Sequence, residues 1–235
     1  MRLAAVACVT ILCACSHSAR NGDADFATLY RKVHASVAFL SMRAPSTNGK
    51  SKNELDDAYG TGVVVASGNW GTRILTAQHV IDHAQHLRVR IGDGKQNVVP
   101  KIVSQDRDQD LALLEISEVK NVPVPPFGDS RRVEAGETVA LVGYPIPDAF
   151  EEEGLDRTAS IYIGHVASVR DAGTPDAAIE LDLPIVPGES GAPVFTSAGT
   201  IVGIAESRFD EERAIGFATP TEVIEPFLRA YAGRR

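Results

Sequence analysis

Short apolar runs separated by glycine turns recur along most of the chain, and this pattern constrains the fold more than any other feature. Such runs lie at residues 59–66, 73–76 and 87–91, and a Gly-Asp-Gly turn at residues 92–94 leads to a further predicted strand at residues 97–103. Short strands at regular spacing are typical of antiparallel barrels and sandwiches, whereas a parallel sheet would alternate strands with helices. The sequence therefore predicts an all-β protein.

The best internal boundary is the proline-rich stretch at residues 121–126, because clustered prolines resist sheet pairing and favour an extended connector. It divides the predicted strands into two sets, at about residues 33–122 and about 128–219. We expect two barrel-like halves with a cleft between them. A helix is predicted at residues 221–231, where apolar residues share one face. The apolar spacing at residues 26–37 predicts a short helix that runs into a strand at residues 36–42.

The composition favours a packed domain and disfavours polyanionic partners. Hydrophobic residues make up 44% of the 235 residues, which is enough for a buried core. The formal net charge of −8 disfavours nucleic acids and anionic membrane surfaces as electrostatic partners.

All three cysteines, Cys8, Cys13 and Cys15, lie near the start of the chain. A basic residue, a short apolar run and small residues before a cleavage point are typical of a secretory leader, predicted here at residues 1–14. The apolar run is too short to span a bilayer as an ordinary helix. Residues 15–25 are then expected to form a tether.

The end of the leader resembles the lipobox of bacterial lipoproteins, which implies that Cys15 becomes the lipidated first residue. We expect the mature protein on the periplasmic side of a bacterial envelope, in contact with the membrane only through this lipid anchor. A plain cleaved leader, giving a secreted or soluble periplasmic protein, is the alternative. If the lipobox interpretation holds, the mature body contains no thiol and depends on core packing alone.

The loop at residues 187–193 presents the hydroxyl of Ser190 between two glycines, with a proline at each end. Glycine permits the dihedral angles of a tight turn and leaves backbone N–H groups open to a ligand. Two such groups aimed at one point are what an oxyanion hole requires, and Gly188 and Ser190 would supply them. A plain polar hairpin turn is the alternative interpretation.

A nucleophilic serine needs a base and a group that orients the base. His79 follows one apolar strand, and Asp110 opens another. We predict that His79 takes the Ser190 proton and that Asp110 fixes the imidazole tautomer. Asp106 and Asp108 are interpreted as loop acids, because Asp110 is the one joined to the apolar run.

Three motifs in order, Thr-Ala-x-His-Val, Asp-Leu-Ala-Leu-Leu and Pro-Gly-x-Ser-Gly-x-Pro, resemble those of the trypsin-fold serine proteases. The resemblance is closest to the bacterial HtrA/Deg branch and covers roughly residues 30–230. It implies a protease domain at residues 26–232, built from two six-stranded antiparallel β-barrels with the active site between them and with no appended PDZ module.

Two residues depart from the family pattern. Glu189 precedes the serine where the branch usually has asparagine, and Ala192 stands where glycine is commoner. In the family these positions point outward or tolerate small residues. The departures therefore bear on loop detail and substrate preference more than on the nucleophile.

The resemblance also implies where the substrate pocket lies. The residue six before the serine is Pro184, so no acid is available there to attract lysine or arginine. The pocket wall is expected from Ile204, Ala205 and Glu206, with a preference for small or medium aliphatic residues. Asp182 is similar to an aspartate of the HtrA serine-loop approach and is assigned a structural role.

His79, His83 and His86 have a spacing that could place them around a metal ion on a short helix. No acidic or cysteine partner stands in a recognisable ligand pattern, so we expect no metal and no other cofactor, and interpret His83 and His86 as solvated helix residues. The acidic run at residues 151–153 is predicted to be solvated surface, with a loop that gates the cleft as the alternative.

The leading hypothesis is a serine endopeptidase that cleaves envelope or unfolded proteins through an acyl-enzyme on Ser190, with proteins or peptides as its partners. A binding protein on a protease scaffold is the competing hypothesis, since a fold does not guarantee chemistry. An esterase with the same triad is a further alternative, which a casein digest would separate from a protease.

Overall fold

The computed structural model describes residues 25–46, 55–206 and 215–232. The predicted leader, Cys15 and nearly all of the predicted tether lie outside the described residues. Along the described ranges, no helix is long and apolar enough to cross a membrane.

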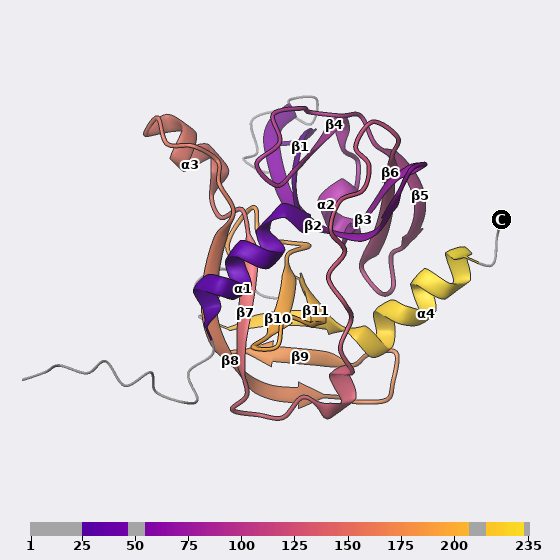
Figure 1. The fold of residues 1–235 in the computed structure, drawn as a ribbon, viewed down its shortest axis with the longest axis vertical. Coiled ribbons are helices and arrows are strands. Elements are labelled where there is room, and N and C mark those ends of the chain that lie inside the picture. Colours follow the sequence, from indigo (N-terminus) through magenta and orange to yellow (C-terminus); the bar gives the residue numbers. More distant parts are fainter. Residues whose placement is uncertain (1–24, 47–54, 207–214, 233–235) are drawn as a thin grey trace, which may run out of the picture.

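The strands form two bodies, and the paired strands are antiparallel in both (Figure 1). The first body is a six-stranded sheet in the order β4-β1-β2-β3-β6-β5. Its strands are β1 (Val37–Pro45), β2 (Leu55–Gly68), β3 (Gly71–Ala77), β4 (Gln85–Ile91), β5 (Lys101–Asp106) and β6 (Leu111–Ile116).

The second body is a closed barrel in the order β10-β11-β12-β9-β8-β7. Its strands are β7 (Thr138–Gly143), β8 (Ser160–Arg170), β9 (Ala178–Leu181), β10 (Pro193–Thr196), β11 (Ile201–Glu206) and β12 (Gly216–Pro220). The predicted proline-rich boundary runs between the two bodies and forms no strand.

These two bodies confirm the predicted all-β fold, but the halves differ in closure. The second half closes into a barrel as expected. In the first sheet, β4 and β5 are the two edge strands, and an isolated bridge joins Val89 of β4 to Val98 in the segment between them. The strand predicted at residues 97–103 begins only at Lys101, because Pro100 lacks the N–H that a ladder needs.

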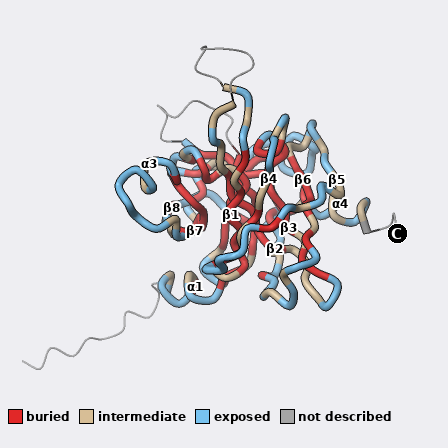
Figure 2. Tube along the Cα trace, turned by 90° about the horizontal axis from the view of Figure 1, so that it is seen from above, coloured by how far each residue is buried: buried red, intermediate tan, exposed pale blue. Residues whose placement is uncertain are grey.

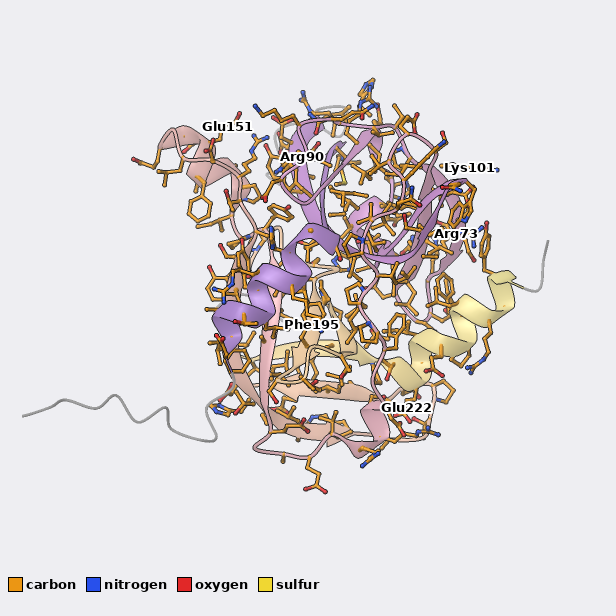
Figure 3. The ribbon with its side chains drawn as sticks, viewed as in Figure 1. Arg73, Arg90, Lys101, Glu151, Phe195 and Glu222 are labelled. Atoms are coloured by element: carbon orange, nitrogen blue, oxygen red, sulfur yellow. The ribbon has the colours of Figure 1, made fainter. Side chains whose placement is uncertain are left out.

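An apolar cluster joins the two bodies. It contains Phe39 and Leu75 from the first sheet and Tyr144, Phe195 and Ile204 from the second half, all 3% exposed or less. Figure 2 shows buried segments concentrated at the centre of the molecule, and Figure 3 marks Phe195 there. Burying such a side chain is worth roughly 1.5–3 kcal/mol relative to exposure, so the cluster holds the two bodies in a fixed relation.

Two helices pack on the same cluster. Helix α1 (Phe26–Val33) contributes Leu29 and Val33, and helix α4 (Thr221–Ala232) contributes Val223. The predicted C-terminal helix is thus confirmed, and the predicted N-terminal helix leads into β1 as expected.

The remaining helices are short, and α3 projects away from the barrel (Figure 1). They are η1 (His34–Ser36), α2 (Gln78–Ile81), η2 (Ser130–Arg132) and α3 (Pro147–Glu152). Proline suits the first turn of α3, where its missing N–H costs nothing. A helix this short shows too little periodicity for the sequence to predict it.

Candidate active site

His79 and Asp110 are placed by the ends of two neighbouring strands. His79 lies in α2, directly after β3, and Asp110 directly precedes β6, which pairs with β3. Asp110 has a positive φ of 50°, and its carbonyl accepts the Gln78 N–H at 3.0 Å. This backbone contact places the start of β6 next to the end of β3.

The Asp110 carboxylate binds His79 with both oxygens. Oδ1 accepts the His79 backbone N–H at 2.8 Å, and Oδ2 lies 2.6 Å from His79 Nδ1. A carboxylate can only accept, so Nδ1 carries a proton and Nε2 is left to act as an acceptor. The side chain of His79 is 41% exposed, which keeps Nε2 accessible to substrate.

Ser190 follows a tight turn at Val186, Pro187, Gly188 and Glu189, and residues 186–191 are called the serine turn. The Glu189 N–H donates to the Val186 carbonyl at 3.0 Å, and Gly188 has φ 92°. Proline followed by a residue of positive φ is typical of a type II turn. A Cβ on Gly188 would lie 2.2 Å from the Tyr144 carbonyl, so glycine is required here.

The orientation of the peptide between Pro187 and Gly188 leaves the Gly188 N–H without an acceptor among the described residues. The Pro187 carbonyl accepts the Ile146 N–H at 2.7 Å, and the peptide bonds of the described chain are trans. The N–H at the other end of that peptide therefore points away from Ile146. Among the described residues, the Gly188 N–H has no acceptor.

The Ser190 N–H is open for the same reason. The Glu189 carbonyl accepts the Ala192 N–H at 2.9 Å, which directs the Ser190 N–H to the opposite side of its peptide. No acceptor for it lies within the described part of the chain. These two open N–H groups are therefore candidates for the donors that an oxyanion hole requires.

The turn meets the first sheet beside the strand that leads to His79. The Thr61 N–H on β2 donates to the Ser190 carbonyl at 2.9 Å. A Cβ on Gly191 would lie 2.4 Å from the Thr76 hydroxyl oxygen, near the end of β3. In the described residues the Ser190 hydroxyl makes no hydrogen bond to His79, and such contacts often tighten only with substrate bound.

Glu189 is buried, against the expectation that this position points outward. Its side chain is 1% exposed, Oε2 accepts the Val186 N–H at 3.0 Å, and Oε1 has no hydrogen-bond partner among the described residues. Burial raises the pKa of Glu189 to about 7. The family departure therefore places a buried ionisable side chain on the residue directly before Ser190.

The residues predicted to form the substrate pocket differ in exposure. Pro184 is exposed, whereas Ile204, Ala205 and Glu206 on β11 are buried. The Ala205 carbonyl accepts the Gly191 N–H at 2.8 Å, so β11 runs directly beside the serine turn.

Other acidic residues lie where the sequence interpretation assigned them or close to it. Asp106 is the last residue of β5 and accepts the N–H groups of Asp108 and Gln109 in the turn that follows. Asp182 accepts the His165 N–H at 2.5 Å and contacts its Nδ1 at 2.9 Å, and these bonds hold the pKa of Asp182 below its usual range. Glu151 is exposed and forms an ion pair with Arg157.

The histidine trio does not share a helix, so that part of the interpretation is wrong. Helix α2 ends at Ile81, and His83 and His86 both have positive φ, His86 within β4. Among the described residues there is no group of three or more histidine, cysteine or acidic side chains that could hold a metal ion.

Sequence reasoning missed Thr61 and Ile146, whose backbone groups bind the serine turn. Thr61 carried a signal, because it stands between two glycines at the start of an apolar run. Ile146 carried none, since its contact depends on a positive φ of 33° that only the folded loop imposes.

Two antiparallel β bodies with a histidine–aspartate pair and a serine turn, in that chain order, define the class of trypsin-like peptidases. The family model described as "Trypsin-like peptidase domain" matches residues 60–204. The chain belongs to this family, and the resemblance to it drawn from the motifs is confirmed.

The relatives found by sequence similarity are named as HtrA or DegP-like serine proteases. The chain is 33% identical over 190 residues to "Serine protease Do-like HtrA" of Bacillus subtilis (strain 168), covering 77% of this chain and 41% of the relative. It is 30% identical over 191 residues to "Probable periplasmic serine endoprotease DegP-like" of Pseudomonas putida (strain GB-1), covering 78% and 37%. The chain thus spans less than half the length of these relatives.

Solved structures show the same fold. The "HtrA-type protease AlgW with decapeptide" has a TM-score of 0.70 at 22% identity, covering 89% of this chain and 68% of that one. The "HtrA-type protease AlgW with tripeptide" has a TM-score of 0.69 at 24% identity, covering 87% and 62%.

Proposed function

We propose that this chain is a serine endopeptidase, with Ser190 as nucleophile, His79 as general base and Asp110 as the group that orients His79. The observation that carries the proposal is the double contact of Asp110 with His79 beside a serine turn whose two N–H groups are open. The family and its protease relatives support it.

In the proposed reaction, the Ser190 oxygen attacks the substrate carbonyl carbon while His79 Nε2 takes the hydroxyl proton. The N–H groups of Gly188 and Ser190 donate to the oxyanion that forms. The C–N bond then breaks, and His79 gives the proton to the leaving amine. Water, deprotonated by His79, hydrolyses the acyl-enzyme and restores the Ser190 hydroxyl.

Proteins or peptides are the proposed substrates, at the periplasmic side of a bacterial envelope. Solved relatives are described with bound peptides, and several relatives are named periplasmic endoproteases. We further propose a leader at residues 1–14 and a lipid anchor on Cys15. No metal or other cofactor has a role in the proposed chemistry.

The proposed pocket of Pro184, Ile204, Ala205 and Glu206 selects small or medium aliphatic residues. Support comes from the absence of an acid at Pro184 and from β11, which runs beside the serine turn. A peptide library should show cleavage after such residues, and preferred cleavage after arginine would contradict this specificity.

The test of the function uses the full chain purified in detergent, beside its Ser190→Ala variant. Both are treated with a fluorophosphonate probe and then with unfolded casein. Labelling and cleavage by the parent alone are expected. Labelling without casein cleavage would favour the esterase, and a folded parent that takes no label would overturn the proposal.

A further inference from the structure

Thr61 joins the first sheet to two residues of the serine turn, Gly188 and Ser190. Its side chain is fully buried in β2, and its hydroxyl donates to the Gly188 carbonyl at 2.7 Å. The same oxygen accepts the Tyr144 N–H at 3.1 Å, while the Thr61 N–H donates to the Ser190 carbonyl at 2.9 Å. One residue thus binds segments that follow it by more than eighty positions in the chain.

The hydroxyl bond fixes the peptide that lies between the two oxyanion donors. At one end of this peptide the Gly188 carbonyl is held by Thr61, and at the other the Glu189 N–H is held by the Val186 carbonyl. The peptides on either side are the ones whose N–H groups, on Gly188 and Ser190, are open. The orientation of the two donor peptides relative to the central one depends on the backbone angles ψ at Gly188 and φ at Glu189, and the bonds at both ends of the central peptide restrain these angles.

We propose that Thr61 is a positioning residue that sets the direction of the oxyanion donors, an inference that rests on the proposed function of Ser190. It touches neither substrate nor the reacting atoms in this role. It acts through the main chain of the serine turn.

The position of Thr61 is itself set by the sheet that carries His79. The Thr76 hydroxyl, on β3 just before α2, donates to the Thr61 carbonyl at 2.7 Å. A Cβ on Gly191 would lie 2.1 Å from that carbonyl, and a Cβ on Gly143 would lie 3.2 Å from the Thr61 hydroxyl. The glycines let both segments approach closely, so the oxyanion donors are aligned against the same body that holds the base.

Thr61→Val tests the proposal, because it keeps the shape and removes the hydroxyl. It leaves the Gly188 carbonyl and the Tyr144 N–H buried without their partner, which favours reorganisation of the turn. The maximal rate of fluorophosphonate labelling should fall about 10- to 100-fold. This decrease does not exceed the one expected when a whole oxyanion donor is removed, because the donors are misdirected and not deleted. The half-saturating probe concentration should stay near that of the parent.

Thr72→Val is the matched control. Thr72 is equally buried on β3, and its hydroxyl donates to the Val119 carbonyl at 2.8 Å, away from the serine turn. The Thr72→Val variant also loses one buried hydroxyl group, so its labelling rate shows the effect of a general loss of stability. Thr61→Ser keeps the hydroxyl and should label within about threefold of the parent, the usual scatter of such effects.

The variants are compared in the full chain, at a temperature where circular dichroism shows each one folded. If Thr61→Val does not fold, Thr61→Cys takes its place, since a thiol is a weak donor and should label more slowly than Thr61→Ser. Labelling of the folded valine or cysteine variant at the parental rate would overturn the role of Thr61 and leave the proposed function intact. A parent that takes no label would overturn both.

Discussion

Asp110 holds His79 at two points, the backbone N–H at 2.8 Å and the ring Nδ1 at 2.6 Å. The same double contact joins Asp182 to His165 in the second barrel. The two pairs differ in surroundings, because the first lies at the end of β3, beside Thr76, against which the serine turn packs. Hydrogen-bond geometry alone therefore does not define the proposed catalytic pair.

Asp110→Asn should lower the rate of casein cleavage by roughly 10³- to 10⁴-fold, because the amide favours the wrong imidazole tautomer. The measurement is the initial rate on casein at neutral pH. Asp182→Asn, which alters the same contact at His165, should change the rate less than about tenfold, since that pair plays no part in the proposed reaction. Equal losses in both variants would contradict the assignment of Asp110.

Glu189→Gln should change how stability depends on pH. Burial raises the pKa of Glu189 from 4.5 to about 7, so the folded chain holds the proton more tightly than the unfolded chain between these values. The contribution of the protonated Glu189 to the free energy of unfolding is therefore fully present below pH 4.5 and is lost as the pH rises through about 7. The loss is at most about 3 kcal/mol at 1.36 kcal/mol per pKa unit.

Urea unfolding at pH 4.5 and pH 8 measures this effect. The free energy of unfolding of Glu189→Gln minus that of the parent should be larger at pH 8 than at pH 4.5, because only the parent loses stability over this range. Glu152→Gln, at an exposed position of α3, provides the control and should give the same difference at both pH values. A constant difference for Glu189→Gln would show that the pKa of Glu189 is the same in the folded and unfolded chains.

Gly188→Ala should lower the labelling rate on the order of 10²-fold, the loss expected from a misplacement of about 1 Å at a reacting centre. The added Cβ would lie 2.2 Å from the Tyr144 carbonyl at a φ of 92°. Gly136→Ala has a similar φ of 89° but meets no atom within 4 Å. It should cost about 1–2 kcal/mol of stability and leave the labelling rate unchanged.

Arg73→Lys should destabilise the fold by about 1–2 kcal/mol without altering the labelling rate. The Arg73 guanidinium binds Glu115 at 2.9 Å and lies 4.7 Å from the ring centre of Tyr231 in α4 (Figure 3). Lysine keeps the charge but not the planar stacking. Arg131→Lys, in an exposed pair, should change unfolding by less than about 0.5 kcal/mol in the same urea titration.

The sequence by itself determined the fold class and the proposed catalytic residues. Strand periodicity and glycine turns are local properties, so they predicted the β strands and the C-terminal helix. The motifs around His79, Asp110 and Ser190 are local as well, and each residue lies close to one end of a predicted strand. Two predicted elements differ from the structure: the strand before Lys101 is shorter because Pro100 interrupts the ladder, and the helix expected to carry His83 and His86 ends at Ile81.

Only the tertiary structure decided the direction and environment of the side chains around the serine. The bond from Thr61 to Gly188 joins residues 127 positions apart, and no local pattern encodes such a distance. Glu189 is buried beside Gly143 and is bonded to the Val186 N–H of its own turn, and its raised pKa follows from that burial. Burial and long-range hydrogen bonding arise from packing two bodies together, which is why they were absent from the pattern of the chain.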